Sequence, residues 1–468
     1  MSGADEGAKA PSVSPFEDTI HTYWRSVTAY RQFGELVATA LSEHQEKHLD
    51  GLKNKLDSII SPFKDAATAE EKIHMSKALR NIGRAFEVKA QQVEALEVNE
   101  EETATDDYNN EDLDELFMSP RAGRTFIQVL KQLDSMSTVY SHEGILFSGI
   151  LTGLVGQFEV LLSDLAYQFY RRAPLAVGVQ ERTLAVTELI TFTSIDDAID
   201  YLIEQRVDDL LRGSAEDWRK FFESRMKLDP AEISPDWERF VECVQRRHLI
   251  VHSGGRISRR YLKNVPSHLV QEYFGEPRLG DTAYLDEIYV SNALTLFETT
   301  GLLLAFSCWQ KLAADPEGLN TVLMHIIYES LLQNQWGTVL RLADWGVKQN
   351  SFIASQKLPC QVNLWLAYKR LGRFGECEKE VRNFDTSALK TVYSLVQAAL
   401  LNDNDRFFSL LETSKGQDLD EAAWDEWPVF DEMRQDPRFN ECKARYTDTK
   451  IKDVKKDNPT SSIEDTQS

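Results

Sequence analysis

The sequence predicts an all-α protein. Aromatic and aliphatic residues recur every three or four positions through most of the chain, as in HTYWRSVTAYRQFGELVATALSEH at 21–44. No segment of any length alternates apolar and polar residues as a strand does. The 468 residues correspond to two to four domains, and an apolar content of 42% is enough for several cores.

The N-terminal region, 1–118, is expected to be helical. After a flexible lead, residues 16–98 predict a long antiparallel helical pair that is interrupted near Ser61-Pro62. The segment from Glu94 to Glu115 then holds eleven acidic residues and no basic one. Such a block repels itself, so it is interpreted as a solvated linker that ends the first domain.

The second region, 119–315, is expected to be a helical bundle. Its most apolar run, from Gly144 to Phe158, has fifteen uncharged residues. A membrane span needs about 20 apolar residues, so this run is interpreted as a buried core helix. Glycines lower helix stability and favour close approach of a second helix. Three of them fall near one face of this helix: Gly149, Gly153 and Gly156.

Boundary signals place another helix of this region at 235–253. Ser234 is a suitable N-cap, Pro235 suits the first helical position, and Gly254-Gly255 favour the C-terminal stop. A further helix from Ala293 to Leu312 is expected to close the bundle.

The third region, 316–445, shows weak repetition. Trp336, Phe374 and Phe407 each follow a small or polar turn and are spaced by 38 and 33 residues. The stretch NLWLAYKRLGRFGECEKEV resembles a tetratricopeptide repeat, whose period is 34 residues, with Gly372 at its turn and Cys377 at its small position. Generic paired helices are the alternative. Residues 446–468 are expected to form a disordered tail.

Charge and cysteine usage limit the function. The formal net charge of −23 argues against a general nucleic-acid coat protein, so any RNA contact must come from a local basic patch. The five cysteines have no metal-ligand spacing, which is typical of a reducing compartment. The polar N-terminus has no signal-peptide pattern. We expect a soluble, cytoplasmic protein without a metal, another cofactor or a membrane contact.

The local basic patch lies at 239–263, RFVECVQRRHLIVHSGGRISRRYLK. It holds seven Lys and Arg residues and one acidic residue, Glu242. RNA can be cleaved without a metal because its own 2′-hydroxyl attacks the phosphorus. Histidine can transfer the protons, a contribution of about 10²–10⁴-fold in rate, and arginine can offset phosphate charge. His248 and His252, four residues apart, share a helical face.

Helix geometry limits which residues can act together. Arg247 and His252 are five residues apart, which is about 140° around a regular helix. They cannot both face one phosphate from such a helix. Either the helix unwinds near 253–255, or a second protomer supplies the other half of the site.

The segment RRHLIVHSGGRISRRYL resembles the signature of HEPN domains, in which an Arg is followed after four to six residues by a His at a helix end. Upstream helices support the resemblance, which covers roughly 138–312. It implies a four-to-five-helix bundle, often a homodimer, and in active members a metal-independent endoribonuclease of the toxin or phage-defence kind. RNA would be the substrate.

The resemblance also implies roles for individual residues. His252 would transfer protons, Arg247 would bind the phosphate, His248 would orient the site or contact substrate, and Arg246 would be an auxiliary cation. Beyond the family pattern, three further residues are candidate contacts to the RNA backbone: Arg256, Arg259 and Arg260.

Two other interpretations stay open. A His and an Arg near a helix C-terminus also complement its dipole, and the glycines would then only stop the helix. Alternatively, the chain is a non-catalytic HEPN scaffold that dimerises through the bundle and binds a protein partner on the C-terminal repeats around Trp365 and Phe374.

Glu159 and Asp164 lie on the apolar helix of the second region and could line the cleft of the site, although local capping or pairing is favoured for both.

Overall fold

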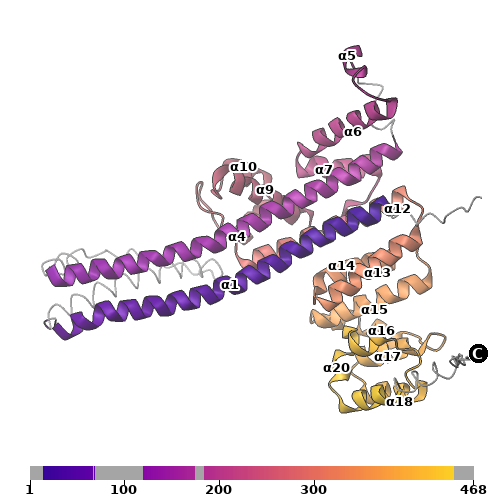
Figure 1. Cartoon of the computed structure of the whole chain (residues 1–468). Helices are drawn as coiled ribbons and strands as arrows, with labels where there is room; N and C mark the ends of the chain where they lie inside the picture. The colour runs from indigo at the N-terminus through magenta and orange to yellow at the C-terminus, as the bar shows by residue number, and fades with distance from the viewer. Residues whose placement is uncertain (1–13, 67, 69–119, 174–183, 447–468) are drawn as a thin grey trace, which may run out of the picture. The chain divides into compact units, whose positions relative to one another are not determined.

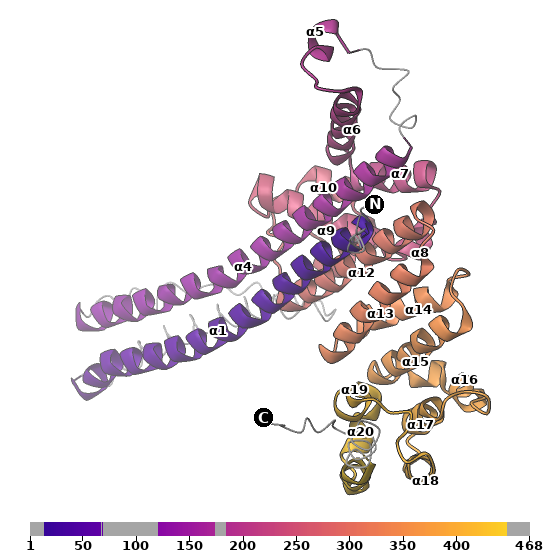
Figure 2. The same cartoon turned by 45° about the vertical axis from the view of Figure 1, so that its right-hand side comes forward.

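The prediction of an all-α protein is confirmed. The computed structural model describes residues 14–66, 68, 120–173 and 184–446. Within these ranges every regular element is a helix, and the only extended pairing is one antiparallel bridge between Arg256 and Thr282. Figure 1 shows the helices along the chain, and Figure 2 shows them after a turn of 45°.

The chain divides into two compact units, and each consists of separate stretches of sequence. Unit 1 comprises 1–20, 226–234 and 298–468, and unit 2 comprises 21–225 and 235–297. This division differs from the predicted one, in which boundaries fell at 118 and 315. The early residues of unit 1 join its C-terminal part through packing, because the ring of Phe16 stacks on Trp309 with 6.1 Å between centroids.

Unit 2 contains most of the region 119–315 that was expected to form a bundle, and α1 and α12 each have one end in unit 1. Its helices are α1 (Pro15–Ala66), α4 (Pro120–Arg172), α5 (Val186–Leu189), α6 (Ile195–Leu211), α7 (Ala215–Phe221), η2 (Phe222–Met226), α9 (Trp237–Ser253), α10 (Arg259–Asn264), α11 (Ser267–Phe274) and α12 (Glu287–Leu312).

Helices α1 and α4 lie side by side in both views (Figures 1 and 2). The expected close approach occurs at Gly153, where a Cβ atom would overlap the phenol ring of Tyr30. Gly149 and Gly156 have open space instead. One of the three glycines therefore carries the close helix contact that the sequence suggested.

An aromatic cluster forms the centre of this unit. Phe158 of α4 lies 4.7 Å from Phe240 of α9 and 5.7 Å from Phe297 of α12, measured between ring centroids. Tyr23 and Trp218 complete the cluster from α1 and α7. Burying such large rings stabilises the bundle and holds α9 in place.

Helix α1 differs from the helix that was predicted for the N-terminal region. Helix α1 continues through Ser61-Pro62 to Ala66, so the predicted break there is wrong. A proline removes one backbone hydrogen bond, and this one lies close to the helix end. The predicted second helix at 70–97 and the acidic segment Glu94–Glu115 lie outside the described residues.

The start of α9 also differs from the prediction. Ser234 does not cap α9; it ends the short helix α8 (Pro230–Ile233), and its hydroxyl oxygen accepts a hydrogen bond from Thr300. Helix α9 begins at Trp237, after Asp236. Its C-terminal stop is as predicted, because Gly254 takes the left-handed conformation with φ 57°. Helix α12 begins at Glu287, six residues before the predicted Ala293.

Unit 1 continues as paired helices. Its elements after α12 are α13 (Pro316–Leu332), α14 (Trp336–Lys348), α15 (Ala354–Arg370), η3 (Phe374–Glu376), α16 (Glu378–Asn383), α17 (Thr391–Leu400), α18 (Asn404–Ser414), α19 (Glu421–Asp425), η4 (Pro428–Phe430) and α20 (Asp431–Arg434). Helix α14 packs on α13 and α15, and α17 packs on α18.

The repeat-like positions fall in different local structures. Trp336 opens α14 and Phe407 is buried in α18, but Phe374 lies in the 3₁₀ helix η3. Gly372 forms the turn, with φ 72°. Paired helices are therefore present, whereas the resemblance to tetratricopeptide repeats stays a prediction.

Among the residues that the structure describes, two helical segments are apolar and long enough to cross a membrane by length and composition alone: Gly144–Arg172 and Glu287–Leu312. Their apolar windows are 44% and 72% buried inside the protein. Buried core helices meet the same criterion, so the expectation of a soluble protein stays a prediction.

Candidate functional site

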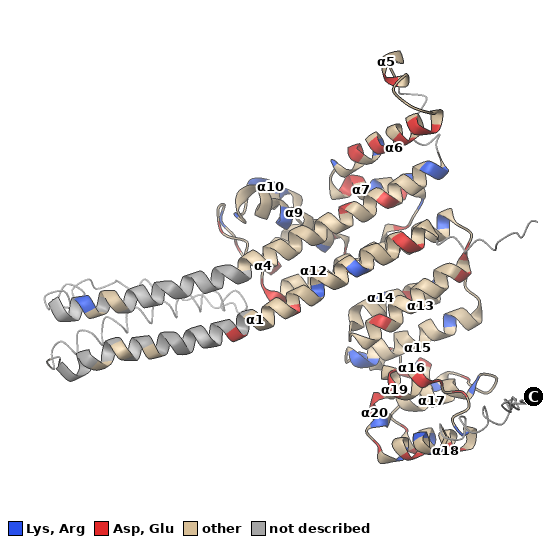
Figure 3. Ribbon diagram, in the orientation of Figure 1, with Lys and Arg blue, Asp and Glu red and all other residues tan. Residues whose placement is uncertain are grey.

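The basic segment, 239–263, covers α9 from Arg239 to its end, the turn that follows, and α10 up to Lys263 (Figure 3). After α9, Gly254 and Gly255 both have positive φ, and the Gly255 N–H donates to the Leu249 carbonyl at 3.0 Å. Glycine takes this conformation without steric cost, so the chain turns sharply. Ser258 then caps α10 by accepting from the Tyr261 N–H.

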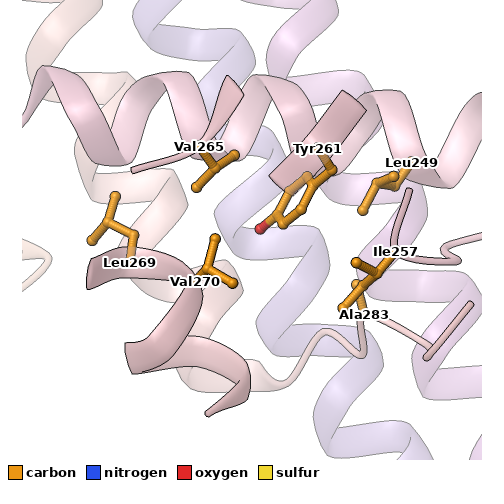
Figure 4. Close-up of a cluster of buried hydrophobic side chains, with 7 residues drawn as sticks. All are labelled: Leu249, Ile257, Tyr261, Val265, Leu269, Val270 and Ala283. Carbon is orange, nitrogen blue, oxygen red and sulfur yellow. The ribbon is translucent and has the colours of Figure 1, made fainter. Parts of the chain in front are cut away.

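A hydrophobic cluster fixes this turn against the helix (Figure 4). Its members come from α9, α10, α11 and the segments that follow each of them: Leu249, Ile257, Tyr261, Val265, Leu269, Val270 and Ala283. All seven are buried. The segment that carries the arginines is therefore held by packing on one side while its other side meets solvent.

A buried carboxylate organises the interior of the site. Glu242 accepts hydrogen bonds from the Arg246 Nε at 2.8 Å, the Tyr261 hydroxyl at 2.5 Å and the Tyr289 hydroxyl at 2.7 Å. A buried charge is tolerated only when it is paired and hydrogen-bonded in this way. Sequence reasoning noted Glu242 only as the one acid of the basic segment. The four-residue spacing to Arg246 was the signal that could have identified the pair.

Arg246 lies inside the protein, with 1% of its surface exposed. Its Nη1 donates to the Tyr284 carbonyl at 3.1 Å, and its guanidinium lies 4.5 Å from the ring centroids of Phe274 and Tyr289. Burial alone would lower its pKa, but the Glu242 carboxylate together with Tyr289 and Tyr261 raises the pKa above its ordinary value. This placement gives Arg246 an internal partner and keeps it away from an external phosphate.

The two histidines of α9 lie together. The ring centroids of His248 and His252 are 5.2 Å apart with an interplanar angle of 73°. His252 is exposed, whereas His248 is partly buried and its Nδ1 has no hydrogen-bond partner among the described residues. Burial lowers the pKa of His248, and the charges of Arg260, Arg247 and His252 lower it further. His248 is therefore held neutral near pH 7.

Arg247 is partly exposed and faces α4. Its Nη2 lies 3.9 Å from Oε2 of Glu159, at the outer limit of an ion pair. Its side chain keeps 23% of its surface exposed, and its Nε has no hydrogen-bond partner among the described residues. An ion pair that is this long and partly exposed is weak, so the guanidinium can leave Glu159 and bind an incoming anion.

Three further arginines form the outer rim of the site: Arg256, Arg259 and Arg260. All three side chains are exposed, and none forms an ion pair with a residue that the structure describes. The effect of Arg260 on the pKa of His248 places its charge near the imidazole pair. These free cations are suited to phosphate oxygens.

Helix geometry decides between the two arrangements considered for Arg247 and His252. Helix α9 is regular through Ser253, so unwinding begins only after both residues. The two side chains consequently stay about 140° apart around the axis. The structure brings His252 together with His248 and leaves Arg247 on another face. A second protomer is the arrangement that stays open.

No metal centre is formed by the residues that the structure describes, since no three His, Cys, Asp or Glu side chains among them are grouped to hold an ion. The five cysteines are all buried and unpaired. Burial raises the pKa values of Cys243 and Cys360 to about 12. Such thiols are poor nucleophiles at neutral pH.

Comparisons with protein-family models, with curated proteins and with solved structures gave no match to this chain.

Proposed function

We propose that the chain is a metal-independent endoribonuclease of the HEPN type, with the site at the end of α9. The observation that carries the proposal is the pair of imidazoles, His248 and His252, set 5.2 Å apart near Arg260, an exposed arginine without an ion-pair partner among the described residues. Imidazoles titrate near neutral pH and arginines bind phosphate, which are the two functions that RNA self-cleavage requires.

The reaction needs no external nucleophile. The RNA 2′-oxygen forms a bond to phosphorus as the bond to the 5′-oxygen breaks, which gives a 2′,3′-cyclic phosphate and a 5′-hydroxyl end. One protein group removes the proton of the 2′-hydroxyl, and another gives a proton to the departing 5′-oxygen. Exposed His252 is the proton-transfer residue of this chain, and neutral His248 contacts it and the substrate.

In-line displacement favours a homodimer. The attacking and leaving oxygens lie on opposite sides of the phosphorus, so the two proton-transfer groups must do so as well. His248 and His252 lie side by side on one helix and therefore serve one side only. A second copy of the chain would supply the group on the opposite side.

The arginines would bind and neutralise the phosphate. Arg247 can leave its 3.9 Å contact with Glu159 for a phosphate oxygen, and Arg260 lies near the imidazole pair. Arg256 and Arg259 would contact neighbouring phosphates. Buried Arg246 has no such role in the proposal, because it holds Glu242 and the Tyr284 carbonyl.

The direct test is incubation of the purified full chain with single-stranded RNA in excess chelator. Wild-type protein should cleave it, and His252→Ala should lower the rate by about 10²–10⁴-fold. Arg212→Ala is the matched control, because Arg212 is an exposed arginine that follows the last residue of α6, outside this site. Equal cleavage by wild type and His252→Ala would contradict the proposal.

A protein-binding scaffold without chemistry is the second candidate. The observation that favours it is a hollow of about 700 Å³ in unit 1 whose lining includes Trp365, Lys379 and Glu380. The exposed Lys379 can be reversed in charge without disturbing the core. This candidate predicts that a protein which copurifies with the wild-type chain is lost from Lys379→Glu and retained by His252→Ala. Retained binding by Lys379→Glu would remove the basis for the candidate.

The site is proposed to act in the cytoplasm. Five buried, unpaired thiols are compatible with a reducing compartment.

A further inference from the structure

Tyr284 is an exposed aromatic residue on a firmly anchored loop. Its side chain is 80% exposed, although a tyrosine commonly buries most of its large ring. Its backbone, in contrast, is held from inside, because its carbonyl accepts a hydrogen bond from the buried Arg246 at 3.1 Å. A ring presented to solvent from a fixed backbone is suited to stacking against a ligand.

Backbone hydrogen bonds attach this loop to the end of α9. The Ala283 N–H donates to the Gly255 carbonyl at 2.8 Å, and the Ile257 N–H donates to the Asp281 carbonyl at 2.8 Å. Arg256 and Thr282 form the isolated bridge between the two segments. Gly255 follows His252 by three residues. Because consecutive Cα atoms are about 3.8 Å apart, the Cα atoms of these two residues are separated by no more than three such steps. Tyr284 therefore lies within reach of a short RNA strand bound at His252.

The charges around the loop are compatible with RNA. Arg256 is directly bridged to the loop and is exposed with no ion-pair partner among the described residues. Two of the three acids near Tyr284 accept hydrogen bonds from the backbone: Asp281 from the Arg278 N–H, and Asp286 from the Tyr289 N–H. The third, Glu287, is exposed. An exposed aromatic ring on a loop whose backbone pairs with a segment carrying an exposed arginine is suited to binding unpaired bases.

We propose that Tyr284 is a base-stacking residue that selects an unpaired nucleotide next to the RNA phosphate at His252. The inference rests on the proposed function for its location, and it adds a specificity-determining residue outside the Arg-to-His segment. Stacking requires an open base face, so duplex RNA would gain nothing from Tyr284, whereas the arginines bind both forms.

Binding can be measured separately from cleavage. The probe is a short single-stranded RNA that is 2′-O-methylated throughout, so that it lacks the attacking hydroxyl. It also carries a 2-aminopurine, whose fluorescence is quenched by stacking. Tyr284→Ala should weaken binding about tenfold or more and abolish the quenching. Tyr284→Phe should keep both. Ile288→Ala is the matched control, since Ile288 is 72% exposed and close in sequence.

Each outcome decides the proposal. Base stacking is supported if Tyr284→Ala alone loses binding and quenching while binding of duplex RNA is unchanged. If natural RNA is not cleaved in that case, only the nuclease proposal fails. Cleavage of natural RNA with unchanged binding by Tyr284→Ala overturns the role of Tyr284 and leaves the nuclease standing. Absence of RNA binding by the wild type overturns both.

Discussion

The imidazole rings of His248 and His252 lie 5.2 Å apart, and His252 is exposed whereas His248 is partly buried. The i, i+4 spacing puts both on one face of α9. The pair consequently combines a neutral, partly buried imidazole with an exposed one. This asymmetry gives the two histidines different environments, in addition to the different roles that the resemblance implies for them.

Arg260 should help to keep His248 neutral. Its positive charge is the second cause, after burial, of the lowered His248 pKa. Arg260→Gln should therefore raise the pKa of His248 towards its ordinary value, as measured by an NMR titration of the imidazole resonances. Arg259→Gln is the matched control, because Arg259 is the neighbouring exposed arginine on α10 and is not among the causes of the shift. Equal shifts in both variants would contradict a local effect of Arg260.

The stability of the chain should depend on His248 between about pH 7.5 and 5.5. The folded-state pKa lies below the unfolded value of about 6.5, so the unfolded state binds more protons as the pH falls through that value. The contribution of neutral His248 is present at higher pH and is lost as the pH decreases. Urea midpoints at the two pH values should fall further for the wild type than for His248→Asn. Parallel decreases would contradict this linkage.

The Glu242–Arg246 pair should be essential to the fold of the site. Both side chains are buried, at 0% and 1% exposure, so the loss of either leaves a buried charge unpaired. Glu242→Gln or Arg246→Met should lower the free energy of unfolding by about 3–5 kcal/mol, measured by urea denaturation.

The matched control for that pair is Arg239–Glu272 in the same unit. It has the same chemistry, but its side chains are 41% and 46% exposed. Breaking it with Glu272→Gln should cost only about 0.2–1 kcal/mol. Similar losses for the buried and the exposed pair would show that burial does not govern the energetics of this region.

The sequence predicted the fold class and several local features because these depend on nearby residues. Helical periodicity can be recognised from residues within one helical turn. The helix stop at Gly254-Gly255 can be predicted because glycine readily adopts positive φ. The start of α9 was misplaced because Ser234 bonds with Thr300, which is distant in sequence. Local capping preferences cannot anticipate such a competing partner.

The candidate site was recovered only in part for the same reason. The spacing of His248 and His252 predicted their shared face, and the concentration of arginines predicted an exposed basic rim. The burial of Arg246 depends on Tyr284, Tyr289 and Phe274, which reach α9 from a later loop and two later helices. The exposed ring of Tyr284 likewise became apparent only when tertiary hydrogen bonds attached its loop to α9.

The most direct measurement is the chemistry of the RNA ends produced in the presence of chelator. A defined RNA would be compared with the same RNA carrying a single 2′-deoxy substitution at the cleavage position. The account predicts 2′,3′-cyclic phosphate and 5′-hydroxyl ends from the first and no cleavage at that position in the second. It also predicts that Arg247→Ala and His252→Ala lose the activity while Arg212→Ala keeps it. Cleavage that persists at the deoxy position, or products with 5′-phosphate ends, would contradict the proposed mechanism.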